Sequence, residues 1–504
     1  MRKESHITQR NFTGKVLLLI TTLTLIPVLL FLVSKCGTKT ESEIKDEELA
    51  KAPGLEESIN QIPKPKSITI KKLEEKDIEN LKPSTPEEGA AFKAKPGDIL
   101  VETDKIRVII QQPSREIGVS TYGGNIIDAD IKREDGTFRD IVGEENWFWF
   151  LGHTLKPEKV GKWKENIIAA TGKLDLLDYI NANGLAETVF KSYIPNFELP
   201  FKVDEERPIK ATKYFVFSDG NHVKIIDVAC NEGKEEIPFF FFADIIDSGG
   251  DVEFFIPSSE LKGYGYKSPL PTGLSAFKTD FIAFVSEKLD SSYGIFPETE
   301  NNVSLIVSGV AAIAYGMLEG DGLNSLLAIA RGTSSKFITL KPSECLKNEK
   351  YFIIGNGSAS SLTDEFFRIK SRKENSEVYQ VKGKVSISGL QVLPSKPRIA
   401  VFDKQNKLIT TAGGDIYGNF KLVLPAGEYK FVAEIKEMPP SEPKLISVPS
   451  VQDVELQIGK PSKIIISAVE KKISGEEINI PAKVSFICQG ECPKKICIKG
   501  CEIL

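Results

Sequence analysis

Residues 211–255 read ATKYFVFSDGNHVKIIDVACNEGKEEIPFFFFADIIDSGGDVEFF, and three apolar runs alternate in them with two short polar segments. The runs cover residues 214–217, 222–229 and 238–246, and the polar segments contain Gly220 and Gly233. Apolar runs of this length, bounded by Asn, Asp and Gly, are typical of β-strands joined by turns. This part of the chain therefore predicts an antiparallel meander within a large sheet or sandwich.

The same pattern continues toward the N-terminus. Residues 99–102 and 106–110 are two apolar runs around a polar turn, which predicts a hairpin. Helical signals are sparse: one helix is expected over residues 324–331, and another from Thr363, as its N-cap, to about residue 370. We therefore expect a mainly β protein, and 504 residues suggest two or three domains.

Residues 381–435 carry a second pattern of strands and turns. They read VKGKVSISGLQVLPSKPRIAVFDKQNKLITTAGGDIYGNFKLVLPAGEYKFVAEI. This segment resembles the carboxypeptidase regulatory-like module, a transthyretin-type, Ig-like β-sandwich, and the resemblance implies about seven strands. Residues 451–459 and 462–472 are expected to complete that sandwich.

Two further resemblances concern the larger β-region. The motifs GDILVETDKIRVIIQ, YGGNIIDADI, LGHTLKP and DIIDSGGDVEFF, between residues 97 and about 266, resemble the N-terminal β-region of CehA/McbA-type PHP metallohydrolase envelope proteins. The resemblance implies a metallohydrolase domain beyond the regulatory-like module, which this chain lacks. Residues 221–245 also resemble the supersandwich of galactose-mutarotase-like domains. Ala243 and Asp244 stand where that family has a catalytic histidine, so mutarotase chemistry is not expected.

The chain divides on composition into five parts. We expect residues 1–36 to be a signal peptide or membrane anchor, 37–94 a flexible tether, 95–375 the large galactose-mutarotase-like β-domain, 376–470 the Ig-like sandwich, and 471–504 a partial β-module with a cysteine-rich tail. The tether is predicted because it is rich in Lys, Glu, Pro and Ser.

The N-terminus predicts export. Basic residues precede an apolar run over residues 16–33, which fits either a cleaved signal or a spanning helix. Cys36 follows in Leu-Val-Ser-Lys-Cys, which resembles a bacterial lipoprotein box except for Lys35, so Cys36 is a lipidation candidate. In each case the folded part is expected in the cell envelope, on the extracytoplasmic side of the membrane.

The cysteines support a similar compartment. The tail contains Cys488, Cys492, Cys497 and Cys501. We expect two disulfides there, with a metal site or free thiols as alternatives, because exported small modules gain most from such crosslinks. Cys230, in a strand, and Cys345, in a loop, are expected to be isolated.

Two groups of side chains are candidate ligand sites. Trp147, Trp149 and His153 could stack on a sugar ring, and the alternative is that they pack between sheets. Asp247 and Glu253, with Asp244 and Asp251, form an acidic cluster that could hold calcium, and the alternative is a solvated turn.

The sequence shows no complete catalytic site. Only three histidines are present, no G-x-S-x-G or P-loop motif occurs, and we expect no cofactor. The formal net charge of −5 argues against nucleic acid as a partner. We therefore expect a non-catalytic envelope protein that binds a glycan, peptide or protein through its large β-domain. The alternatives are the front half of a PHP-type metallohydrolase system and a sugar-active enzyme that uses carboxylates.

Overall fold

A computed structural model describes most of the chain. The described residues are 43–81, 91–113, 122–149, 153–176, 207–250, 252–257, 266–267, 275–307, 310–436, 438–450, 452–459, 463–466 and 486–489. The predicted signal or anchor with Cys36 lies outside them, as do Cys492, Cys497 and Cys501. Within these residues, no helix is long and apolar enough to span a membrane.

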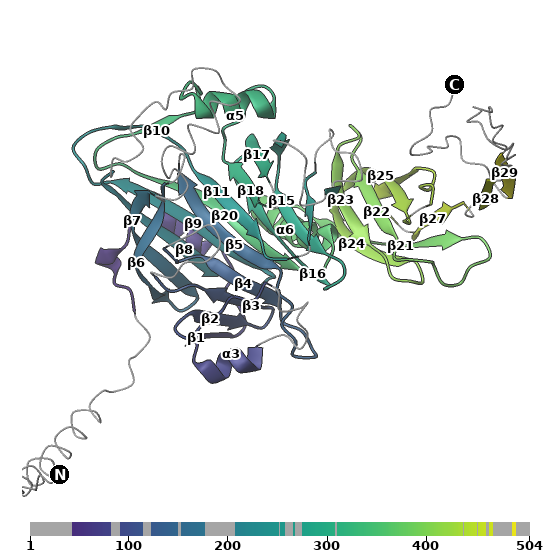
Figure 1. The fold of residues 1–504 in the computed structure, drawn as a ribbon, viewed down its shortest axis with the longest axis horizontal. Helices are drawn as coiled ribbons and strands as arrows, with labels where there is room; N and C mark the ends of the chain where they lie inside the picture. The colour runs from purple at the N-terminus through teal and green to yellow at the C-terminus, as the bar shows by residue number, and fades with distance from the viewer. Residues whose placement is uncertain are drawn as a thin grey trace, which may run out of the picture. The chain divides into compact units, whose positions relative to one another are not determined.

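The larger part of the fold is one connected β-sheet, which contains eighteen strands in the described residues (Figure 1). These strands are β1 (Ile68–Lys72), β2 (Ile99–Thr103), β3 (Ile106–Ile110), β4 (Ile126–Ile131), β5 (Val142–Trp149), β6 (His153–Lys164), β7 (Ile167–Leu176), β8 (Ile209–Phe217), β9 (His222–Asn231), β11 (Ala243–Ser248), β12 (Glu253–Phe255), β13 (Tyr266–Lys267), β14 (Ser275–Thr279), β15 (Ile282–Ser286), β16 (Ser291–Pro297), β17 (Asn302–Val307), β18 (Val310–Ala314) and β20 (Cys345–Gly355). All the pairings in this sheet are antiparallel. The mainly β class is confirmed.

The predicted meander is largely correct. Strands β8 and β9 pair as expected, with Ile209 opposite Asn231. The third predicted strand is divided in two at residues 241–242, and Phe239, within its first half, adopts a φ of 59°. Its first half, β10 (Ile237–Phe240), pairs with β19 (Ile338–Leu340), and its second half, β11, pairs with β5 and β18.

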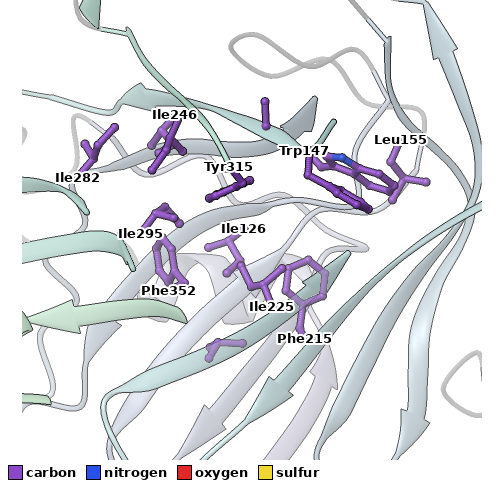
Figure 2. Packing of buried hydrophobic residues seen from close by; sticks show 14 of the residues in the cluster. Ile126, Trp147, Leu155, Phe215, Ile225, Ile246, Ile282, Ile295, Tyr315 and Phe352 are labelled. Carbon is purple, nitrogen blue, oxygen red and sulfur yellow. The ribbon is translucent and has the colours of Figure 1, made fainter. Parts of the chain in front are cut away.

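The main hydrophobic core lies between strands of the large sheet (Figure 2). Trp147, Leu155, Tyr315 and Ile126 all belong to it. All four side chains are buried. Since β-branched and aromatic residues pack well on a pleated surface, the richness of this chain in Phe, Ile and Val explains why strands prevail.

The predicted flexible tether is wrong for the described residues before residue 95. This segment forms η1 (Asp46–Glu48), α2 (Leu55–Asn60), β1 and α3 (Glu75–Leu81). Leu49, Leu55 and Ile59 are buried in a second core, against the face of the sheet that carries Tyr214. The Tyr214 hydroxyl donates a hydrogen bond to the Ala50 carbonyl at 2.6 Å. The apolar residues here are too scattered to form a periodic pattern, and the sheet supplies the rest of their core.

The two helices predicted in the large domain are both present. Helix α5 (Gly322–Ala330) begins after Asp321, whose carboxylate accepts from the Asn324 amide. Helix α6 (Ala359–Glu374) begins earlier than predicted, because Ser358 is its N-cap and accepts from the Ser361 amide at 3.2 Å. The predicted N-cap, Thr363, is inside the helix.

The C-terminal sandwich has the predicted seven strands in the described residues. One sheet has β24 (Asn419–Pro425), β21 (Val378–Ile387) and β27 (Val454–Ile458), and the other has β23 (Leu408–Gly413), β22 (Arg398–Phe402), β25 (Gly427–Glu434) and β26 (Lys444–Val448). Of residues 462–472, which were predicted to complete it, the structure describes only β28 (Lys463–Ile466). This strand pairs instead with β29 (Phe486–Gln489), where Cys488 is opposite Ile464.

Candidate functional site

Trp147 and His153, two of the three residues predicted to stack on a sugar, do not form a surface platform, and the side chain of Trp149 lies outside what the structure describes. Trp147 is fully buried and stacks on Phe242, with ring centroids 5.6 Å apart. His153 is 2% exposed, and its backbone pairs with that of Trp149. The third tryptophan, Trp163, packs against the second core. For Trp147, the structure supports the alternative of packing inside the protein.

The predicted acidic cluster is dispersed. Asp247 lies 3.9 Å from the Lys93 ammonium, whereas Glu253 pairs with Arg398 of the C-terminal sandwich. Asp244 points into the interior, and Asp251 is outside the described residues. Among the residues that the structure describes, no group of three His, Cys, Asp or Glu side chains is arranged to hold a metal ion.

A buried network of charges lies inside the large domain, and sequence reasoning did not find it. The Lys350 ammonium, on β20, is 2.5 Å from the Asp244 carboxylate of β11, 2.7 Å from Asp227 of β9 and 3.0 Å from Glu145 of β5. Lys213, on β8, is 2.9 Å from Glu145. All five side chains have no exposed surface. We call these five residues the interior network.

Burial and charge act in opposite directions on the acids of the interior network. Burial raises the pKa of Asp244 to about 7, and Lys350 only partly opposes this rise. Burial also acts on Glu145, but Lys213 and Lys350 together lower its pKa to about 2. The Tyr315 hydroxyl donates a hydrogen bond to Asp244 Oδ2. A soluble substrate does not reach these enclosed groups, so their arrangement does not fit acid–base catalysis on a bound ligand.

An open cavity lies where α6 meets the C-terminal sandwich. It has a volume of about 670 Å³, and its walls combine hydroxyl, amide, carboxylate and ammonium groups with a similar share of apolar surface. Its lining residues are Glu287, Asp290, Asn356, Gly357, Ser358, Ser360, Ser361, Asp364, Arg368, Gln380, Lys382, Gly383, Lys396, Pro397, Gly413, Gly414, Asp415, Asn419, Phe420, Lys421, Leu422, Val423 and Asp453. We call this space the junction cavity.

Direct contacts hold the walls of the junction cavity together. Arg398 Nε lies 2.7 Å from Glu287, and Lys396 lies 3.5 Å from Asp290. The hydroxyls of Thr363, on α6, and Thr410, on β23, are 2.7 Å apart and buried. The cavity is therefore a preformed feature of this part of the chain, as ligand pockets usually are.

Asp364, in the wall of the junction cavity, makes the stability of the fold depend on pH. Its carboxylate accepts from the Val423 amide at 2.8 Å, and burial nevertheless raises its pKa from 3.8 to about 7. Between these values the folded state binds more protons than the unfolded state, so this group makes stability fall as pH rises, by up to about 1.4 kcal/mol per pH unit.

We expect Asp364→Asn to remove the fall in stability that Asp364 causes as pH rises. The asparagine keeps an acceptor for the Val423 amide but does not titrate. Urea unfolding of both proteins at several pH values between 4.5 and 7.5 should show the variant gaining stability relative to the parent as pH rises. A constant difference would contradict the assignment.

Cys230 and Cys345 form a disulfide, which corrects the prediction that both are isolated. They lie directly opposite each other on β9 and β20, so Cys345 is in a strand and not in a loop. The sequence contains a signal that could have indicated this disulfide. Of the seven cysteines, the lipidation candidate Cys36 and the four tail cysteines leave one pair.

No family model matches the chain, and no curated protein matches its sequence. The Slr1438 protein of Synechocystis sp. PCC 6803 is a similar solved structure, with 12% identity and a TM-score of 0.32 over 52% of this chain and 97% of its own. A putative aldose 1-epimerase of Klebsiella pneumoniae has 11% identity and a TM-score of 0.30 over 56% and 85%. The GalM/aldose epimerase homologue of C. elegans has 9% identity and a TM-score of 0.29 over 50% and 97%. The resemblance to CehA/McbA-type proteins stays a prediction.

Proposed function

We propose that this protein is an exported, non-catalytic binding protein that holds a polar, polyhydroxylated ligand such as a saccharide in the junction cavity. The observation that carries the proposal is the lining of that cavity. Ser358 and Ser361 offer hydroxyls, and Gln380 and Asn419 offer amides. These groups both donate and accept hydrogen bonds, as saccharide hydroxyls require.

Two observations support the other parts of the proposal, which are the lack of catalysis and the export of the protein. The acids of the interior network are enclosed and paired with lysines, which favours binding over catalysis. The disulfide between Cys230 and Cys345 favours an oxidising compartment, because reducing conditions inside cells rarely allow structural disulfides to persist. Export therefore has support that does not depend on the N-terminal apolar run.

A panel of immobilised neutral and acidic oligosaccharides tests the proposal. We expect the protein to bind at least one class, and Gly413→Gln to weaken that binding at least tenfold. Gly413 lines the cavity, and an added Cβ would lie 3.7 Å from that of Ser358, so a longer side chain would enter the space. Gly250→Gln is the matched control, since a Cβ there meets nothing within 4 Å.

Two results would overturn the proposal. Binding that is equally strong in Gly413→Gln would place the ligand elsewhere. Release of new reducing ends or unsaturated sugars from the bound oligosaccharide would show that the protein is an enzyme.

A further inference from the structure

We propose that Lys350 and Asp244 join covalently, through an amide between the lysine Nζ and the aspartate carboxyl carbon, and so crosslink β20 to β11. In the structure the two side chains are 2.5 Å apart and have no exposed surface. Their positions in the chain are 106 residues apart. The fold therefore holds an amine and a carboxyl group in contact, in a site that excludes the water needed to hydrolyse the product.

The surroundings of Asp244 favour its role as the electrophile. Tyr315 donates its hydroxyl hydrogen bond to Oδ2, and Lys350 Nζ lies 2.5 Å from both Oδ1 and Oδ2. A hydrogen bond to Oδ2 stabilises the negative charge that develops there when an amine attacks the carbon. The raised pKa of Asp244, caused by burial, lets this carboxyl retain its proton near neutral pH. A protonated carboxyl can lose a hydroxyl as water, which a carboxylate cannot.

The interior network also supplies a proton acceptor. Burial alone would lower the pKa of Lys350, but Asp227, Asp244 and Glu145 together raise it above its ordinary value. The free amine therefore arises when its proton moves to a neighbouring carboxylate. Asp227 suits this step, because one oxygen lies 2.7 Å from Nζ and the other, Oδ1, has no hydrogen-bond partner in the described residues.

The step balances without any other reactant. Asp227 first takes the ammonium proton, and the lone pair of Nζ then attacks the carboxyl carbon. Asp227 gives that proton to the departing hydroxyl and accepts a second proton from the nitrogen, so the C–O bond breaks, one water molecule leaves and Asp227 ends protonated. Nothing is oxidised or reduced, and no cofactor takes part. The product is a secondary amide, which has no charge at either former end.

Lys213 provides an internal comparison. It is equally buried, and it lies 2.9 Å from Glu145. The strongly lowered pKa of Glu145 keeps that carboxyl ionised, so it does not act as an electrophile. We therefore expect Lys213 to retain a free amine while Lys350 does not.

The test is mass spectrometry of the folded, purified chain after denaturation, reduction and alkylation. We expect an intact mass lower by one water than that calculated for the alkylated chain. Trypsin should then yield a branched peptide that joins residues 235–262 to residues 348–368, since a modified Lys350 is not cleaved. Cleavage after Lys213 should be complete in the same digest.

The variants Asp244→Ala and Lys350→Met should each restore the full mass. A parent protein with the full mass and normal cleavage after Lys350 would overturn the proposal. A branched peptide that joins Lys350 to residues 225–234, which carry Asp227, would overturn the assignment of Asp244 as the electrophile.

Discussion

Replacing both Cys230 and Cys345 with alanine should lower the free energy of unfolding by about 4 kcal/mol. The disulfide joins residues 115 apart, and a crosslink that closes a loop of about this length is worth roughly 4.7 kcal/mol through its effect on the unfolded chain. Cys230 is 8% exposed, so part of the effect also comes from packing. Urea unfolding of the parent and the double variant measures the difference.

A reducing agent provides the control for this prediction. It should destabilise the parent protein, once the disulfide has been exposed in denaturant, and leave the double variant unchanged. Equal stability of parent and variant under oxidising conditions would contradict the prediction. Mass spectrometry of protein taken directly from cells, with free thiols blocked before any reduction, also tests export. Free thiols at Cys230 and Cys345 would argue against an oxidising compartment.

Lys350→Met should cost about 3–5 kcal/mol. In molecules without the proposed amide it leaves buried carboxylates without a shared cation, and in molecules with the amide it removes the crosslink. Glu145, Asp227 and Asp244 all lie within 3.0 Å of the lysine ammonium. Lower pH should restore part of the loss, since protonation removes the uncompensated charge. Chemical unfolding at two pH values measures both effects. The same loss at both pH values would contradict the electrostatic cause.

Two further variants isolate the source of this loss. Lys404→Met removes an exposed ion pair with Glu428, 3.3 Å away, and should cost less than about 1 kcal/mol. Lys213→Met removes a cation from the interior network but leaves Lys350 and Asp244 in place. Its cost therefore reflects the ion pairs alone, whereas that of Lys350→Met also includes the proposed amide. Equal losses for Lys404 and Lys350 would show that burial does not matter.

Local patterns were sufficient for many elements of the fold. The hairpin of β2 and β3 follows from two apolar runs around a polar turn, and its pairing places Ile99 opposite Ile110. In the C-terminal sandwich, whose seven strands the resemblance implied, β22–β23 and β25–β26 are hairpins of the same kind. In these cases the partners are neighbours in sequence, so the turn between them fixes the pairing, whereas β21 pairs with the distant strands β24 and β27.

Local sequence patterns did not predict the contacts between residues that are distant in the chain. The segment before residue 95 has too few apolar residues to form a core alone, and the face of the sheet around Tyr214 completes it. The junction cavity joins segments that are distant in sequence, such as Asp290 and Asp453. Its polar side chains resemble those of any solvated surface, so composition gave no indication of it.

The sequence by itself determined the mainly β class, the helix over α5 and the seven-stranded sandwich, because these depend on the alternation and turns of adjacent residues. Only the tertiary structure decided that Cys230 meets Cys345 and that Lys350 meets three carboxylates. Charge and thiol groups carry no periodic signal of their partners. Which of them meet depends on the order of strands in the sheet, and that order is set by packing of the whole core.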